Sequence, residues 1–148
     1  MTPVESSPTL DLVIVDTSGW IAFLARKGFP EIKKAIAGLL DEDRIATTGP
    51  IFLELIQGTR TQDEKEGTAR RLRALHWLRV TDEHWYQAAS LAFDLRRKGV
   101  TVPAMDALIA ILAIDYDCEL LHSDGDYNLI AEHSSLRVFT LTSHSPTM

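Results

Sequence analysis

Residues 12–16 read LVIVD, four aliphatic side chains followed by one aspartate. A continuous, mostly β-branched run of this kind is typical of a strand that is buried on both faces. Such strands occur in parallel sheets, whose two faces are covered by helices. The stretch therefore predicts the centre of an α/β fold, with Asp16 placed where the strand ends.

Outward from this stretch, strand and helix patterns alternate along the chain. Further short strands are expected at residues 44–47, 76–81, 118–121 and 136–141. Helices are expected at residues 30–40, 49–57, 62–75, 82–98, 103–114 and 124–133, with Asp82 as the N-cap of the fourth. The alternation predicts a three-layer α/β/α sandwich around a mainly parallel central sheet. We expect residues 1–148 to form a single domain with an ordered core at about 11–142.

The composition limits the setting in which the chain works. No apolar run reaches the roughly 18 residues that span a bilayer, so no membrane contact is expected. The N-terminus lacks the basic and then apolar layout of a secretion signal, and the single cysteine, Cys118, permits no internal disulfide. We therefore expect a cytoplasmic protein. The net charge of −6 argues against a nucleic-acid coat protein, which needs a basic surface.

Five acidic residues adjoin apolar segments at expected strand ends and helix starts, or stand alone within an apolar stretch. They are Asp16, Glu54, Asp106, Asp124 and Asp126. Taken singly, each is more simply explained by a structural role. In α/β folds, however, ligands bind beyond the carboxyl ends of the strands, where Asp16 and Asp124 both lie. A cluster of carboxylates without His or Cys suits Mg²⁺ or Mn²⁺ rather than zinc.

The charge balance also bears on the substrate. Without these five acids, the 21 acidic residues would fall to 16, against 15 basic ones. Most of the net negative charge would then lie in one pocket, and the remaining surface could bind a polyanion such as RNA. Arg60 is one candidate phosphate contact on that surface, although a solvated helix face explains most of the basic runs more simply.

Other kinds of site fit the same residues less well. Asp124, Asp126 and Asn128 match the first ligand positions of an EF-hand loop, but Leu129 stands where that loop needs glycine. No glycine-rich phosphate loop and no G-x-S-x-G nucleophile motif occurs. Two alternatives stay open. One is a catalytically silent acidic module that binds a basic partner peptide, and the other is a metal-dependent phosphatase.

Four segments, in this order, resemble the PIN-domain ribonucleases, in particular the VapC-type toxins of bacterial toxin–antitoxin pairs. They are VIVDTSGWIAFL with Asp16, FLELIQGTR with Glu54, TVPAMDALIAILA with Asp106, and LLHSDGDYNLIA with Asp124 and Asp126. The resemblance extends from about Leu12 to Leu141. It implies an α/β/α fold and a Mg²⁺- or Mn²⁺-dependent endoribonuclease that cleaves RNA phosphodiester bonds.

The resemblance also implies roles for single residues and for partners. The catalytic acids would be Asp16, Glu54, Asp106, Asp124 and Asp126, and all of them except Glu54 would be metal ligands. Thr17, Ser18 and Ser123 would contact these acids or the RNA through their hydroxyls. Tyr127 stands where phenylalanine is frequent. Because family members commonly form homodimers and are silenced by a cognate antitoxin protein, we expect both partners here.

Overall fold

The computed structural model describes residues 11–141, and its centre is a sheet of four short strands. The strands are β1 (Val13–Val15), β2 (Ile45–Thr48), β3 (His76–Leu78) and β4 (Glu119–Leu121). They lie in the order β3-β2-β1-β4, and every pair is parallel. Successive connections run from β1 through β2 to β3, and the next one crosses back to the other side of β1. A crevice is expected at the carboxyl ends of β1 and β4, where this change of direction occurs.

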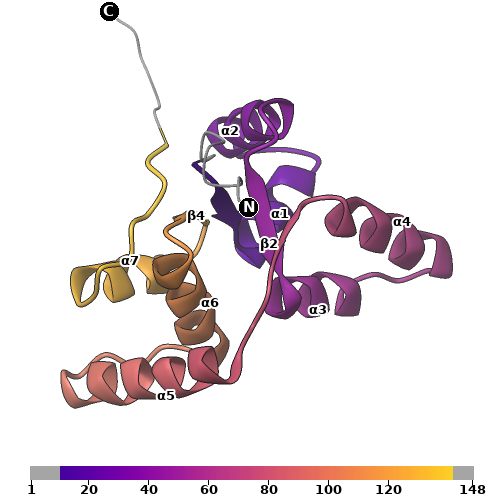
Figure 1. Ribbon diagram of the computed structural model, residues 1–148. Coiled ribbons are helices and arrows are strands. Elements are labelled where there is room, and N and C mark those ends of the chain that lie inside the picture. Colours follow the sequence, from indigo (N-terminus) through magenta and orange to yellow (C-terminus); the bar gives the residue numbers. More distant parts are fainter. Residues whose placement is uncertain (1–10, 142–148) are drawn as a thin grey trace, which may run out of the picture.

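Seven helices within residues 11–141 cover the sheet. They are α1 (Thr17–Leu24), α2 (Pro30–Asp41), α3 (Gly49–Gln57), α4 (Gln62–Arg73), α5 (Asp82–Arg97), α6 (Ala104–Asp115) and α7 (Gly125–Glu132). Connections between parallel strands are right-handed as a rule, which places α1–α4 on one face and α5 and α6 on the other. Figure 1 shows α3 and α4 on the β2 side, and α5, α6 and α7 grouped on the β4 side. The expected three-layer α/β/α architecture is confirmed.

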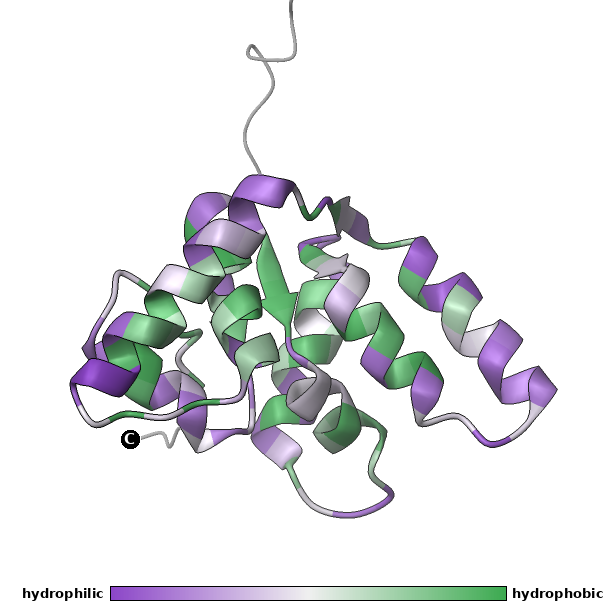
Figure 2. Cartoon of the chain, turned by 90° about the horizontal axis from the view of Figure 1, so that it is seen from below, coloured by the Kyte–Doolittle hydropathy of each residue, from purple (hydrophilic) through white to green (hydrophobic). Residues whose placement is uncertain are grey.

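None of the helices described in residues 11–141 combines the length and the hydrophobicity needed to cross a membrane. Apolar residues instead gather toward the middle of the molecule, while hydrophilic residues lie mostly on the outer faces of the helices (Figure 2).

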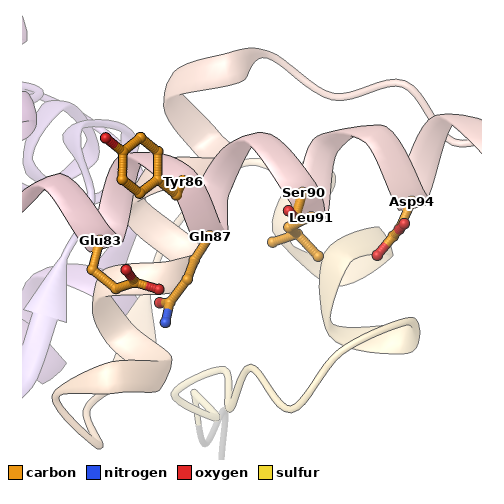
Figure 3. A pocket seen from close by; sticks show the side chains of 6 residues that line it. All are labelled: Glu83, Tyr86, Gln87, Ser90, Leu91 and Asp94. Atoms are coloured by element: carbon orange, nitrogen blue, oxygen red, sulfur yellow. The ribbon is translucent and has the colours of Figure 1, made fainter.

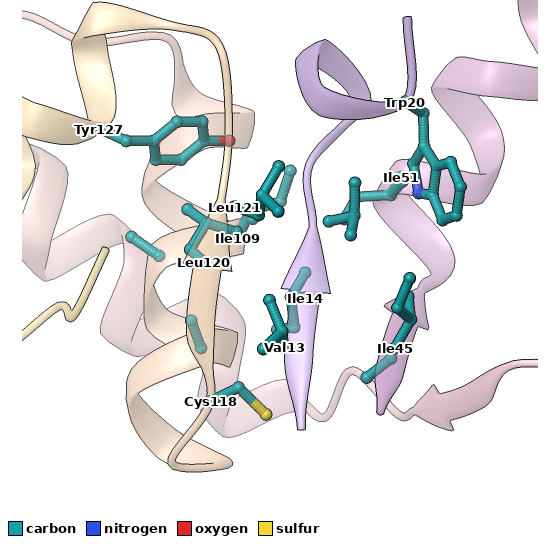
Figure 4. Close-up of a cluster of buried hydrophobic side chains, with 14 of the residues drawn as sticks. Val13, Ile14, Trp20, Ile45, Ile51, Ile109, Cys118, Leu120, Leu121 and Tyr127 are labelled. Carbon is teal, nitrogen blue, oxygen red and sulfur yellow. The ribbon is translucent and has the colours of Figure 1, made fainter. Parts of the chain in front are cut away.

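The LVIVD stretch forms the buried middle of the sheet, as its pattern predicts. The side chains of Val13, Ile14 and Val15 are at most 1% exposed. They are buried because β2 and β4 flank β1 within the sheet, and helices cover both of its faces. Figure 4 shows Ile14 between Ile45 of β2 and the side chains of β4. The carboxyl end of β1 is thereby fixed in position, and Asp16 with it.

Two elements differ from the expected pattern. Helix α1 was not expected, yet it begins directly after β1. The strand expected at residues 136–141 is reduced to one parallel bridge between Leu120 and Val138. Alternate residues of a parallel strand bond to opposite neighbours, so the three-residue strand β4 offers only Leu120 to its outer edge. Residue 142, which the expected core includes, lies outside the described residues.

The start of α5 also differs by one residue. Thr81, and not Asp82, is the N-cap. Its hydroxyl accepts a hydrogen bond from the backbone N–H of His84, whose Nδ1 in turn accepts the Thr81 N–H at 2.9 Å. This reciprocal pair satisfies two backbone donors at the helix start, so Asp82 becomes the first helical residue.

Candidate active site

Two of the expected site acids lie at the carboxyl ends of adjacent strands and begin helices there. Asp16 follows β1 and is the N-cap of α1, while Asp124 follows β4 and is the N-cap of α7. Asp124 accepts a hydrogen bond from the backbone N–H of Asp126 at 3.0 Å. Because β1 and β4 pair in parallel, both helix starts meet at one edge of the sheet. Asp16 and Asp124 therefore cap helices and also lie together at the edge where a site is expected.

The Asp16 carboxylate is buried, at 4% exposed, and both of its oxygens accept hydrogen bonds. Oδ2 accepts from the backbone N–H of Ser18 at 2.9 Å and from its hydroxyl at 2.7 Å. Oδ1 accepts from the Tyr127 hydroxyl at 2.8 Å. The Ser18 hydroxyl oxygen also accepts the backbone N–H of Ser123 at 2.9 Å. Ser18 thus joins the turn after β1 to the turn after β4, and the two expected serines contact each other.

The carboxylates of Asp106, Asp124 and Asp126 form a second, tighter group. One oxygen from each lies within 4.8 Å of the others. Asp106 comes from the first turn of α6, and the other two from the start of α7. Asp16 adjoins this group through Tyr127, whose hydroxyl lies 3.3 Å from Oδ1 of Asp106. The structure therefore brings four of the five expected acids together, three as one group and Asp16 beside it.

The surroundings of Asp106 shift its ionisation. Burial, followed by repulsion from Asp124, Asp16 and Asp126, raises its pKa from 3.8 to about 7, and the hydrogen bond from Tyr127 opposes this rise. Its Oδ2 is buried and has no hydrogen-bond partner among the described residues. A buried carboxylate oxygen without a donor is unfavourable unless a proton or a cation compensates its charge. This oxygen is therefore a favourable place for one.

Glu54 joins the site through a different residue. Its Oε1 accepts the Thr17 hydroxyl at 2.5 Å, which links α3 to the start of α1. Glu54 is not one of the three grouped carboxylates. Arg60, the expected phosphate contact, is exposed beyond the end of α3. Among the described residues, only its backbone N–H is recorded in a hydrogen bond, to Glu64 at 2.8 Å, and no recorded hydrogen bond joins its side chain to the acids.

Tyr127 and His122 also lie beside the acids, and neither was expected to be catalytic or to bind the metal. Tyr127 is fully buried, and its ring packs 5.2 Å from the ring of His122. Nδ1 of His122 accepts the backbone N–H of Asp124 at 3.0 Å, and burial lowers the pKa of His122. The helical spacing from Tyr127 to the buried Ile130 could have placed the tyrosine on the inner face of α7. No such signal marks its hydroxyl as a partner of Asp16.

The donor set fits a hard divalent cation. The group of Asp106, Asp124 and Asp126 offers only carboxylate oxygens, the ligands that Mg²⁺ and Mn²⁺ prefer. The unpartnered Oδ2 of Asp106 adds a buried negative atom in need of compensation. The residues present thus fit the metal that the sequence pattern predicts.

Two hollows lie away from the acids. One, of about 340 Å³, runs along α5 and is lined by Glu83, Tyr86, Gln87, Ser90, Leu91 and Asp94 (Figure 3). The other, of about 490 Å³, is lined by Phe52, Arg73 and Trp77. Neither contains an expected site residue, and the convergence of carboxylates is therefore the stronger pointer to chemistry.

Comparison with known proteins identifies the family of this chain. The PIN domain family matches residues 13–133. The chain is 31% identical over 130 residues to VapC ribonuclease Mb1587 of Mycobacterium bovis and to Ribonuclease VapC11 of Mycobacterium tuberculosis, an overlap of 85% of this chain and 96% of each relative.

Solved structures show the same fold. FitAcB from Neisseria gonorrhoeae superposes with a TM-score of 0.66 at 15% identity, over 87% of this chain and 97% of that one. VapBC2 from Rickettsia felis, bound to a DNA fragment from its promoter, gives 0.68 at 17% identity, over 86% and 97%. With a family match over most of its length and 31% identity to VapC ribonucleases over 85% of the chain, it belongs to the PIN domain family, among its VapC-type members.

Proposed function

We propose that this chain is a Mg²⁺- or Mn²⁺-dependent endoribonuclease that cleaves RNA phosphodiester bonds and acts as the toxin of a toxin–antitoxin pair. The observation that carries the proposal is the group of carboxylates from Asp106, Asp124 and Asp126, with Asp16 beside it, at the carboxyl ends of β1 and β4. The names of the relatives, which are ribonucleases, support the reaction class.

Asp106, Asp124 and Asp126 would hold the cation, with Asp16 as the fourth proposed ligand. Once bound, the cation supplies charge compensation for an RNA phosphate and lowers the pKa of a water molecule. Without it, the carboxylates would repel the RNA backbone. The chain's own contribution is to fix these oxygens on the first turns of α6 and α7, so that they need little reorganisation.

Glu54 is proposed as the group that orients or deprotonates the attacking water. Thr17 holds its Oε1, and Oε2 has no recorded partner among the described residues. A carboxylate with one oxygen fixed and the other free is suited to accept a proton from water within hydrogen-bond reach. Ser123 and Ser18 would support the turn that carries Asp124, because their hydrogen bond joins the two helix starts. Arg60 is proposed to contact RNA phosphates farther from the acids.

The proposal extends to partners and setting. Solved structures with the same fold include toxin–antitoxin complexes, which supports a cognate antitoxin protein as the partner that silences this chain. We further propose a homodimer that works in the cytoplasm, with residues 1–148 forming one PIN-like domain.

Cleavage of RNA by the purified chain tests the reaction. We expect Mg²⁺ or Mn²⁺ to support cleavage of RNA, and EDTA to abolish it. Asp16→Asn and Asp106→Asn should each lower the rate by at least about 100-fold. Asp94→Asn, an acid on the exposed side of α5, is the matched control and should cleave like wild type. Equal rates for Asp106→Asn and Asp94→Asn would sink the assignment.

Two further assays separate the rival functions. A silent acidic module would bind a basic peptide but cleave no RNA with any divalent metal, and a phosphatase would turn over small phosphomonoesters. Inducible expression tests the toxin role, since wild type should arrest growth and Asp106→Asn should not. Equal growth of both strains would contradict the toxin role while leaving the nuclease assay to decide the chemistry.

A further inference from the structure

The hydroxyl of Tyr127 lies between two site carboxylates. It is 2.8 Å from Oδ1 of Asp16 and 3.3 Å from Oδ1 of Asp106. The residue is fully buried, and its hydroxyl has one proton to share between two negatively charged acceptors. Figure 4 shows the ring entering from α7 with the hydroxyl turned toward β4 and β1. A neutral side chain of the same shape without the hydroxyl would fill the space and leave both oxygens without this donor.

The other donors around Asp16 are already in use. Ser18 supplies two hydrogen bonds to Oδ2, so Oδ1 depends on Tyr127 alone among the described residues. Asp106 is in the same position, because within the described part of the chain Tyr127 is its one recorded hydrogen-bond donor and its Oδ2 has none. The Tyr127 hydroxyl is therefore a donor shared by the buried Asp16 carboxylate and the half-buried Asp106 carboxylate.

We propose that Tyr127 is a positioning residue whose hydroxyl partly neutralises Asp16 and Asp106 in the metal-free protein and so competes with the divalent cation for these two carboxylates. The inference rests on the proposed function, because it assumes that the acids bind a cation. Its new element is that the Tyr127 hydroxyl lowers the affinity of the site for metal and stabilises the arrangement of the site when no metal is bound. Removing the hydroxyl should then tighten metal binding and loosen the metal-free fold.

The test is a titration of the full chain with Mn²⁺ in the absence of RNA. Tyr127→Phe keeps the ring and removes one oxygen. We expect its Kd for Mn²⁺ to be about fivefold lower than that of wild type, the ratio that the loss of one competing hydrogen bond gives. Its unfolding midpoint should fall in EDTA, and the difference from wild type should shrink in saturating Mn²⁺. An unchanged or higher Kd overturns the inference.

Tyr116→Phe is the matched control. Its hydroxyl donates to the backbone oxygen of Arg79 at 2.7 Å, at the end of α6 opposite Asp106. The variant should lower the unfolding midpoint equally with and without Mn²⁺ and should leave the Kd unchanged. If Tyr127→Phe behaves in the same way, its hydroxyl has only a structural role and the inference is wrong.

Two further measurements separate the possible failures. If wild type binds Mn²⁺ and Asp106→Asn does not, the metal site stands and the Tyr127 result decides this inference alone. If Asp106→Asn binds as tightly as wild type, both the metal site and the inference fall. Should Tyr127→Phe not fold, the near-ultraviolet absorption of wild type is informative. Adding Mn²⁺ should change the tyrosine absorption of wild type, and the same change should occur in Tyr116→Phe, which still contains Tyr127. If Mn²⁺ causes no such change, the inference is overturned.

Discussion

Asp106 is the residue at which the chemistry of the site and the stability of the fold oppose each other. Burial and neighbouring acids raise its pKa from 3.8 to about 7. The folded metal-free protein therefore binds this proton more tightly than the unfolded chain does. The stabilisation is complete below pH 3.8, declines as pH rises, and is lost above about pH 7. Asp106 thus destabilises the metal-free fold in the pH range where its charge can hold a cation.

Asp106→Asn removes the carboxylate charge that destabilises the metal-free fold. We expect the free energy of unfolding of the variant in EDTA at pH 8 to exceed that of wild type by about 1–2 kcal/mol, a value reduced for solvent screening of a half-buried group. The gap should narrow toward pH 5. Urea denaturation at both pH values measures it, and a variant less stable than wild type at pH 8 would contradict the raised pKa.

Thr17 is the residue that holds Glu54 in place. Thr17→Val removes the hydroxyl and keeps the branched shape, so the Glu54 carboxylate loses the only donor recorded for it within residues 11–141. We expect the rate of RNA cleavage to fall about tenfold at saturating Mn²⁺, with no change in the Kd for Mn²⁺, because general-base positioning and metal binding use different residues. Thr59→Val removes a comparable hydroxyl bond, to Ile56, and is expected to leave both quantities unchanged.

At the scale of elements, Gly19 leaves no room for a side chain between helix α1 and the ends of β1 and β4. A Cβ on Gly19 would lie 3.0 Å from Cγ1 of Val15 and 3.2 Å from the backbone oxygen of Leu121. The absent side chain lets α1 pack where β1 and β4 end, and so lets Asp16 reach Tyr127. Gly19 therefore determines how closely α1 and Asp16 approach the rest of the site.

Gly19→Ala should cost about 1–3 kcal/mol of unfolding free energy, because backbone and two side chains must move. Gly38→Ala is the control. It lies in α2 with open space around the new methyl, and should stabilise the protein by about 0.5–1 kcal/mol. Thermal unfolding of both variants measures these changes. If Gly19→Ala is as stable as wild type, α1 can shift without a cost in stability.

The differences between expected and observed elements have the same kind of cause. Strong, long patterns such as those of α5 and α6 were predictable to within a few residues. Helix α1 spans eight residues and includes Gly19, so its own helix propensity is weak. It forms because Asp16 caps it and the ends of β1 and β4 receive it. Residues 136–141 have strand propensity, but the length of β4 leaves them a single bridge. Both outcomes depend on tertiary neighbours that a local pattern does not contain.

At the scale of the whole molecule, metal binding should be visible in global stability. A cation that binds only the folded state adds RT ln(1 + [L]/Kd), about 2.7 kcal/mol at 100 times Kd. We expect Mn²⁺ at that excess to raise the free energy of unfolding of wild type by about this amount, and EDTA to reverse the effect. Asp106→Asn should show no comparable gain. Chemical denaturation with and without Mn²⁺ measures both proteins.

Most of the candidate site could be expected from the sequence because acids at strand ends and helix starts are placed by topology. Asp16, Asp106, Asp124 and Asp126 converge for this reason. The division into a group of three and an adjoining Asp16 was not predictable, because it depends on where each carboxylate lies in the folded chain. Arg60 could not be assigned in the same way, because the sequence around it does not indicate how far its side chain lies from the acids.

The use of Asp16 and Asp124 as helix caps restricts how this gene could lose its activity by mutation. Alanine at either position would remove a cap as well as a carboxylate, whereas asparagine caps a helix about as well as aspartate does. Asp106 caps no helix and destabilises the metal-free fold at neutral pH. Where selection favours loss of toxicity, inactivating substitutions should therefore occur first at Asp106. The inactive proteins should remain folded and should still bind the antitoxin.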